Sequence, residues 1–196
     1  MNNESIVRLI FSFLGGGVVA AILNWIRTNR AEKREGKIGF LDSQIRKLYG
    51  PLYYFVSQSE KLFELNKRIM NAYNKEFIGK KFSEDPGTQE TVGKRIKETI
   101  GIANSYIDEV EKNNEKIKEI LDNNYSYIDR EDIDVFIKFY EHHIRLQKER
   151  DEEKRVKTPF PIYQEVGDIS FLRPEFINRV KEKFLKKKAE LDKLIK

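Results

Sequence analysis

The sequence predicts an all-α protein: an N-terminal transmembrane helix, then an antiparallel four-helix-bundle-like cytoplasmic domain whose long first helix is kinked. Three observations lead to this prediction. Residues 9–26 contain no charge, the rest of the chain repeats apolar residues at helical spacing, and 196 residues include only 5 prolines and 11 glycines. The expected boundaries are a short extracytoplasmic N-terminus (1–5), a transmembrane helix (6–26), a basic juxtamembrane segment (27–37) and a cytoplasmic helical domain (38–196).

Composition narrows the classes of function. Charged residues make up 35% of the chain, which is too much for a protein that spans a membrane many times. The absence of cysteine excludes disulfides, cysteine-ligated zinc, iron–sulfur clusters and thiol nucleophiles. The net charge of +5 is mild, so the position of the charges matters more than their sum.

The first expected element is the transmembrane helix. An eighteen-residue helix from Leu9 to Ile26 is about 27 Å long, close to the ~30 Å hydrocarbon thickness of a bilayer. The run holds three consecutive glycines, residues 15–17, which in water favour a loop. In lipid they stay helical, because an unpaired amide there costs several kcal/mol.

The flanks of this run orient it. The aromatic Trp25 lies near the C-terminal end of the run and a basic cluster follows it, whereas only Arg8 precedes it. The positive-inside rule therefore places the C-terminal side in the cytoplasm of a bacterial inner membrane and the N-terminus outside. The expected membrane-interface residues are Trp25, Arg27, Arg30, Lys33 and Arg34.

Two other interpretations of the glycine-rich run are weaker. A phosphate-binding loop needs a preceding strand and a following Lys or Ser/Thr, which "GGGVVAAIL" lacks. A cleavable signal peptide fits the small residues of "VVA", but its N-terminal region would hold the acidic Glu4, and the apolar run continues to Trp25. An uncleaved signal-anchor helix is favoured.

Small residues recur every four positions within the predicted span. Such stripes let two helices approach closely, which predicts a homo-oligomer formed in the membrane. Glycine and alanine are also common in all spans, so both interpretations stay open. The candidate helix-packing residues are Ser12, Gly16, Gly17, Ala20 and Ala21.

The next expected element is one long amphipathic helix over residues 31–76. Apolar residues from Ile38 to Tyr73 follow the i, i+3, i+4, i+7 spacing of a single helix face. Pro51 has no amide hydrogen and disfavours helical geometry at Gly50, so a kink is expected there. The apolar stripe keeps its phase across this point, which predicts a bend and not a reversal.

Three further helices complete the predicted domain. Asp85 caps a helix over 86–122, Asp129 and Asp132 form a capping arrangement for a helix over 130–155, and a last helix runs from Pro174 to the end. Between the last two, the proline-containing and apolar residues 156–172 are expected to fold back over the bundle. Four amphipathic helices bury their stripes most simply as an antiparallel bundle.

The histidines His142 and His143 are the strongest candidates for chemistry. Adjacent residues of a helix point about 100° apart and do not easily bind one metal ion together. His143 also lies on the inward stripe, so a core role is favoured over catalysis. The acidic segments match neither a calcium loop nor a di-iron bundle, and no metal or cofactor is expected.

Two further surfaces are candidates for binding. One is a group of aromatic residues that either line a partner groove or fill the core, and their helical spacing favours the core. These residues are Tyr49, Tyr53, Tyr54, Phe160 and Tyr163. From Pro174 onward the chain has eight Lys/Arg and four acidic residues, which suit an anionic inner leaflet. No nucleic-acid recognition motif accompanies this charge, and a solvated helix face also accounts for it.

The segments "KIGFLDSQIRKLYGPLYYFV", "FIKFYEHHIRLQKER" and "PFPIYQEV" resemble a group of small bacterial single-span membrane proteins with a helical cytoplasmic domain. That resemblance implies an architecture and no activity. The expected function is a membrane-anchored, non-enzymatic interaction module (adaptor, sensor or recruitment protein) with the lipid bilayer and another protein as partners. One alternative is a membrane effector or toxin whose span oligomerises and permeabilises the bilayer, as in phage defence. The second is a hydrolase using His142 and His143.

Overall fold

Helices account for all the regular secondary structure that is described. The computed structural model describes the backbone of residues 3–81, 85–155 and 172–196, and the side chains of residues 17–81, 85–148 and 172–196. Within these ranges there is no strand, so the predicted all-α class is confirmed. The long helices are α1 (Asn3–Gln44), α2 (Gly50–Phe77), α3 (Pro86–Asn123), α4 (Ile133–Arg155) and α6 (Pro174–Ile195).

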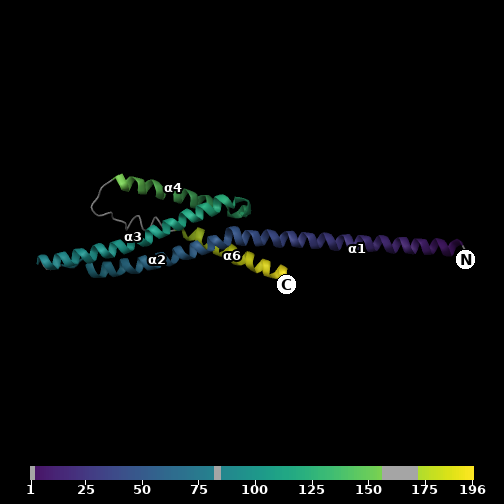
Figure 1. Ribbon diagram of the computed structural model, residues 1–196, viewed down its shortest axis with the longest axis horizontal. Coiled ribbons are helices and arrows are strands. Elements are labelled where there is room, and N and C mark those ends of the chain that lie inside the picture. The colour runs from purple at the N-terminus through teal and green to yellow at the C-terminus, as the bar shows by residue number, and fades with distance from the viewer. Residues whose placement is uncertain (1–2, 82–84, 156–171) are drawn as a thin grey trace.

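The first two helices form one continuous rod. A five-residue π-helical segment, η1 (Ile45–Tyr49), joins α1 to α2 without a gap (Figure 1). The Gly50 amide donates to the Ile45 carbonyl five residues earlier, which is the π-helical pattern. Pro51 supplies no amide hydrogen, and its ring crowds the preceding turn, so a widened turn at this point has a physical cause. The predicted irregularity is therefore a π-turn, and the chain continues without reversing.

Gly50 is required by this π-turn. A Cβ atom on Gly50 would lie 2.6 Å from the Ile45 carbonyl oxygen, closer than real Cβ contacts allow. It would also lie 3.7 Å from a ring carbon of Phe184 in α6. Only glycine fits both the widened backbone and the close approach of α6.

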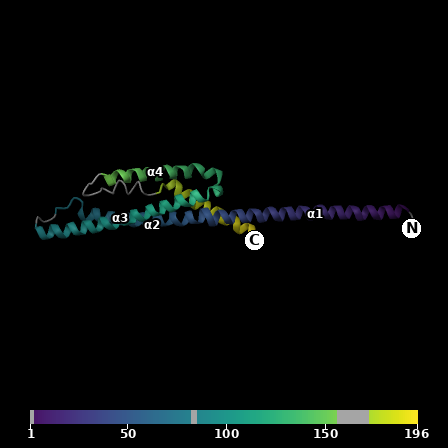
Figure 2. The ribbon, with the colours of Figure 1, turned by 45° about the horizontal axis from the view of Figure 1, so that its top comes forward.

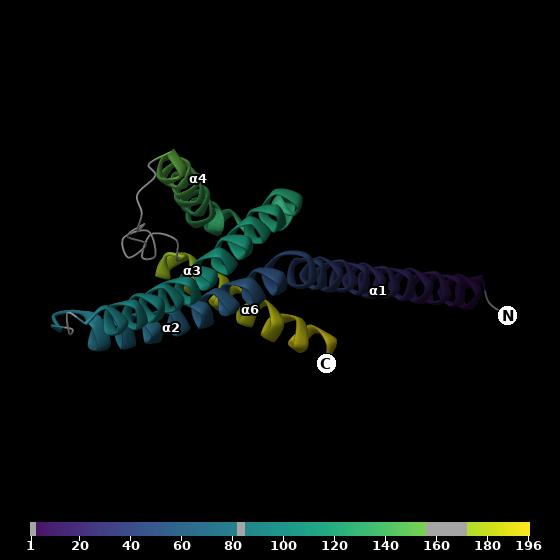
Figure 3. The ribbon, with the colours of Figure 1, turned by 60° about the vertical axis from the view of Figure 1, so that its left-hand side comes forward.

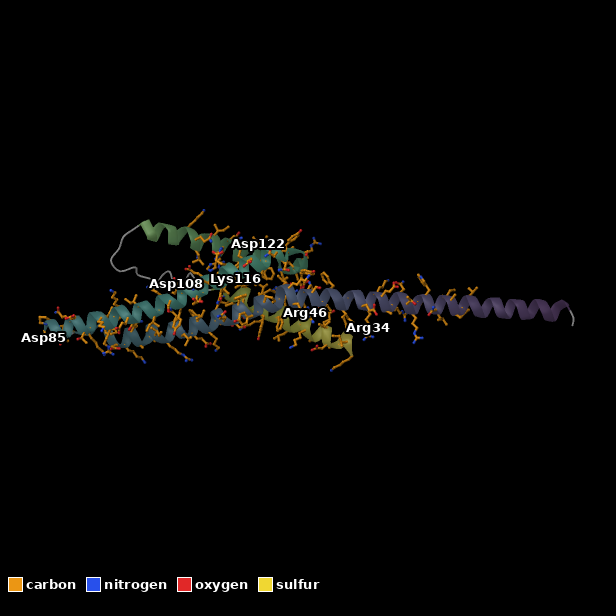
Figure 4. All side chains as sticks on the ribbon, viewed as in Figure 1. Arg34, Arg46, Asp85, Asp108, Lys116 and Asp122 are labelled. Carbon is orange, nitrogen blue, oxygen red and sulfur yellow. The ribbon has the colours of Figure 1, made fainter. Side chains whose placement is uncertain are left out.

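The pair α2 and α3 forms an antiparallel hairpin that extends away from α1 (Figure 1). Its turn contains Gly79 at φ +73°, a conformation that favours glycine. Asp85 caps α3 as predicted, because its Oδ2 accepts from the Thr88 amide at 3.0 Å. Figure 4 shows Asp85 at the far tip of the hairpin.

Helix α6 connects the other elements. It begins beside α4, crosses the rod at η1 and ends beside α1 (Figures 2 and 3). Helix α6 crosses the rod, so the rod, α3, α4 and α6 form a crossed assembly at the inner end of the α2/α3 hairpin. The core gathers at this crossing, which we call the base, and contains Leu48, Tyr49, Leu52, Val56, Ile117, Leu121, Val135, Phe136, Phe139, Leu172, Phe176 and Val180.

The predicted cap of the third helix is wrong. A short 3₁₀ segment, η3 (Arg130–Asp132), precedes α4, and the Asp129 side chain makes no capping hydrogen bond. Both carboxylates of the expected cap instead contact side chains of the rod and α6. Buried lysines on α6 compete for these carboxylates, and a charge-assisted contact is stronger than a neutral cap.

Among the residues whose side chains are described, no helix carries an apolar stretch long enough to cross a membrane. The predicted span begins within residues 1–16, whose side chains lie outside the described residues, so it stays a prediction. The expected fold of residues 156–171 lies outside the described residues as well.

Candidate functional site

Six polar side chains meet at the crossing of the rod and α6, and we call them the junction cluster. Gln44 precedes the π-turn of the rod and Tyr49 ends it, two members come from the connection between α3 and α4, and two are lysines on successive turns of α6. Five of the six are almost inaccessible to solvent. The members are Gln44, Tyr49, Asp129, Asp132, Lys183 and Lys187.

Lys187 joins α6 to the end of α1. Its Nζ donates to Gln44 Oε1 at 2.8 Å and to Asp129 Oδ1 at 3.0 Å, and lies 5.0 Å from the centre of the Tyr49 ring. Gln44 in turn donates through Nε2 to the Tyr127 carbonyl at 2.8 Å and to Asp129 Oδ1 at 3.0 Å. The side-chain amide of Gln44 thus both donates and accepts hydrogen bonds. The ammonium group of Lys187 has two oxygen acceptors and lies near an aromatic ring.

Lys183 joins α6 to the connection between α3 and α4. Its Nζ donates to Asp129 Oδ2 at 2.9 Å, contacts Glu131 closely, and lies 3.4 Å from Asp132 Oδ1. The other oxygen of Asp132 accepts from the Tyr49 hydroxyl at 2.7 Å. Asp129 and Asp132 therefore bridge the lysines of α6 to the rod.

The cluster holds its charges as ion pairs. Burial alone would raise the pKa of Asp129, but hydrogen bonds from Lys187, Lys183 and Gln44 outweigh burial and lower it to about 2. Burial raises the pKa of Asp132 above its ordinary value. Burial and the hydrogen bond to Asp132 also raise the pKa of Tyr49. Tyr49 is thus a neutral phenol over the physiological range, and Asp129 is ionised.

The geometry of the junction cluster suits fixing helices in place. Tyr49 and Asp132 are 0% exposed and Lys183 is 2% exposed, so solvent does not reach their polar atoms. A reacting group must approach a substrate to hydrogen-bond distance, which such burial prevents in this conformation. The cluster therefore fixes α6, the rod and the α3–α4 connection relative to one another.

The two lysines of the cluster were missed by sequence reasoning. The charge pattern places Lys183 and Lys187 in a basic C-terminal helix, but both lie on its inward stripe between Val180 and Leu191. Lysines four residues apart on an apolar stripe are rare inside proteins unless they are paired. This spacing was the available signal for a buried ion-pair cluster.

Both histidines of α4 lie in the interior. His142 and His143 are 5% and 4% exposed. The His143 ring stacks on Phe139, and its Nε2 lies 3.4 Å from a carboxylate oxygen of Glu115 on α3. Burial lowers the pKa of His143. The described residues contain no group of three His, Cys, Asp or Glu side chains that could hold a metal ion.

The members of the candidate aromatic groove differ in exposure. Tyr49 is fully buried and belongs to the core, because its ring lies beneath Lys187 and its hydroxyl is bonded to Asp132. Tyr53 stacks on Phe184 of α6 with ring centres 4.6 Å apart, whereas Tyr54 is 61% exposed. The other two members, Phe160 and Tyr163, lie outside the described residues.

The candidate membrane residues lie along α1. Gly17, Ala20, Ala21 and Trp25 are exposed, while the side chains of the packing candidates Ser12 and Gly16 lie outside the described residues. The interface candidates Arg27, Arg30 and Lys33 are exposed as well.

Arg34 has a contact that the sequence did not suggest. Its Nε donates to the Leu194 carbonyl at the end of α6 at 3.0 Å, and its Nη2 contacts the same oxygen (Figure 4). One turn further along α1, the ammonium group of Lys37 pairs with Glu190 at 2.8 Å. Residues 27–37 therefore contact the C-terminal end of α6.

The fold and the junction cluster define a crossed α-helical protein built on one continuous rod. Comparison of the chain with protein-family models, with curated protein sequences and with solved structures found no match in any of the three. The resemblance to small bacterial single-span proteins stays a prediction from the sequence.

Proposed function

We propose that this protein is a single-span membrane protein that presents a helical interaction module on a rigid helical stalk. The observation that carries this proposal is the continuity of α1, which runs without a break from the apolar run to the junction cluster. Residues 27–44 of α1 would form a stalk about 27 Å long. A helical stalk fixes the distance of the domain from the bilayer, which a flexible linker does not.

The anchor rests on the sequence of residues 9–26. The run is uncharged and about as long as the hydrocarbon layer is thick, Trp25 lies near its C-terminal end, and the basic segment follows it. The predicted location is the bacterial inner membrane, with the helical domain in the cytoplasm.

We assign partner binding to the outer part of the hairpin, residues 57–77 and 86–112, which we call the arm. Its two helices pack mainly on each other, through contacts such as Asn66 Nδ2 to the Ala103 carbonyl at 3.0 Å. Their outer faces expose apolar side chains, including Leu65 at 40% and Ile102 at 49%. The arm points away from α1, so in the proposed orientation it faces the cytoplasm (Figure 1). Helices of a partner can add to such a pair by apolar contacts.

Fractionation of cells that express the full chain tests the anchor. We expect the protein in the membrane pellet after alkaline carbonate washing, because that treatment strips peripheral proteins and leaves spanning helices inserted. Recovery of the intact chain in the supernatant of a detergent-free lysate would contradict the anchor.

Cross-linking in native membranes tests the arm. Leu65→Glu and Ile102→Glu should each reduce cross-linking to a partner at least several-fold, since a charge opposes an apolar contact. Leu185→Glu is the control, because Leu185 on α6 is 58% exposed and lies outside the arm. Equal loss in all three variants, or in none, would contradict the assignment to the arm.

A further inference from the structure

The net positive charge of this protein comes from two segments. Residues 27–37 and 186–196 together hold ten Lys/Arg and four Asp/Glu, out of totals of 37 and 32. The rest of the chain is therefore close to neutral, with 27 basic and 28 acidic residues. The two segments lie far apart in the sequence, so their meeting is a property of the fold.

The fold places these two segments side by side. Arg34 binds the Leu194 carbonyl, and Lys37 pairs with Glu190. Going from Arg34 to Lys37 along α1, the contacted residue on α6 moves back from Leu194 to Glu190. The two helices therefore run antiparallel. The C-terminal end of α6 consequently points toward the N-terminal part of α1, on the side of the predicted span (Figure 4).

Most cations of the two segments face solvent. Arg34 and Lys37 are exposed but bonded to α6, and the other exposed cations are Arg27, Arg30, Lys33, Lys186, Lys188, Lys193 and Lys196. The apolar Ile195 lies among them at 64% exposed. Lys187 differs, because it is buried in the junction cluster. Cations that surround an exposed apolar residue are typical of surfaces that rest on a lipid headgroup layer.

We propose that residues 27–34 and 193–196 form one basic surface that lies on anionic phospholipid headgroups. The proposal rests on the proposed function for the orientation of α1. Arg34 follows Ile26 by eight residues, or about 12 Å of helix, and the headgroup layer extends about 5–7 Å beyond the hydrocarbon. The end of α6 then lies within about one Debye length, 8–10 Å, of the headgroups.

The position along α6 decides which lysines contribute. Lys193 and Lys196 lie at the end nearest the predicted membrane, and a lysine near an anionic surface strengthens binding about fivefold. Lys186 and Lys188 lie about one and a half turns or more further away, beyond a Debye length. The contribution of each lysine to lipid binding therefore falls with its distance from the C-terminal end of α6.

A lipid surface fits this arrangement better than nucleic acid. The basic surface adjoins the residues predicted to enter the bilayer, so lipid headgroups are already present at high local concentration. No nucleic-acid recognition motif occurs in the sequence. The test below includes duplex DNA, so that binding of nucleic acid is one of its outcomes.

The full chain in lipid nanodiscs provides the experiment. Because the chain has no cysteine, Ile195→Cys can carry a single environment-sensitive fluorophore, quenched by headgroup-labelled lipid. We expect strong quenching in an equimolar mixture of phosphatidylglycerol and phosphatidylcholine, and several-fold weaker quenching in pure phosphatidylcholine or at high salt. Ile102→Cys on the arm is the control and should show no quenching in either lipid.

Two matched charge variants test the gradient along α6. Lys193→Gln with Lys196→Gln should reduce the response of the Ile195 label to anionic lipid by more than tenfold, at about fivefold per lysine. Lys186→Gln with Lys188→Gln removes the same charge and should leave most of the response. Equal effects of the two pairs would overturn the proposed surface.

The single tryptophan separates this proposal from the proposed function. Quenching of Trp25 by brominated acyl chains reports insertion of the span. If Trp25 is quenched but the Ile195 label ignores lipid charge, the basic surface is overturned and the anchor stands. If the label responds to anionic lipid while Trp25 is not quenched, the surface stands and the anchor fails. A response to duplex DNA and not to anionic lipid would overturn the proposed surface, as would no response to either.

Discussion

The base and the arm of this protein use the same two helices in different ways. At the base, α2 and α3 bury apolar residues against α4 and α6, and the junction cluster closes one side of that core. In the arm the two helices pack mainly on each other, and polar residues such as Asn66 lie in their seam. Two helices that pack only on each other bury less apolar surface than a core of several helices, so they gain less stability from burial. Stability is therefore concentrated in the base, and the arm leaves its outer faces available.

The largest expected effect comes from removing a charge of the junction cluster. Lys183→Ala leaves the carboxylates of Asp129 and Asp132 with fewer cations in a buried setting, and breaking a buried ion pair in this way typically costs about 3–5 kcal/mol. Thermal unfolding of the full chain in detergent, followed by circular dichroism, measures the change.

Lys188→Ala is the matched control for Lys183→Ala. Lys188 is exposed on the same helix, so its removal should change the free energy of unfolding by no more than about 0.5 kcal/mol. Similar destabilisation by the two variants would show that the junction cluster contributes nothing beyond helix propensity.

Replacing a glycine by alanine should change the stability of the protein in opposite directions in the base and in the arm. Gly50→Ala places a Cβ 2.6 Å from the Ile45 carbonyl oxygen, and we expect a loss of about 1–3 kcal/mol from overpacking. Gly101→Ala on α3 meets nothing within 4 Å, and we expect a gain of about 0.5–1 kcal/mol from helix propensity. Denaturant unfolding of both variants measures the difference, and a gain in stability for Gly50→Ala would contradict the tight π-turn.

Much of the fold was predictable from the sequence, because it depends on local patterns. The spacing of apolar residues predicted the helices, and Asp85 with Pro86 predicted the start of α3 at Pro86, where it begins. Pro51 predicted an irregularity in the right place, since its missing amide hydrogen is a local property. The continuity of the rod across it followed from the phase of the stripe.

The junction cluster was not predictable from local patterns. Asp129 and Asp132 have the spacing of a helix cap, and only the arrival of α6 turns them toward lysines more than fifty positions away. The contact between Arg34 and Leu194 likewise joins residues 160 positions apart. The sequence left Tyr49 either in a partner groove or in the core, and the structure places it in the core. Tertiary contacts between distant segments decided each of these cases.

Acid should weaken the base through Asp129. The pKa of Asp129 falls from its ordinary 3.8 to about 2 in the folded state. A lowered pKa contributes stability above the unfolded value, so this contribution is present above pH 4 and is lost as the pH falls from about 4 to about 2. Asp132 acts in the opposite direction, because burial raises its pKa.

Asp129→Asn isolates the contribution of Asp129 to this pH dependence. The variant should be less stable than the parent protein at pH 6, and the gap should narrow at pH 3. Urea unfolding at both values measures the gap. A gap that stays constant between these values would contradict the assignment to Asp129.

The most local expected effect lies at the tip of the arm. Asp85→Ala removes the carboxylate that accepts from the Thr88 amide at 3.0 Å, and loss of such a cap costs about 1 kcal/mol. Because the arm packs mainly on itself, this cost should appear as faster hydrogen exchange in the first turns of α3, with the unfolding temperature of the base unchanged. Asp85→Asn is the control, since its amide oxygen can still accept the Thr88 amide. If exchange rises equally in η1 and in α6, the arm and the base unfold as one unit, and the division of the molecule into a stable base and an available arm is wrong.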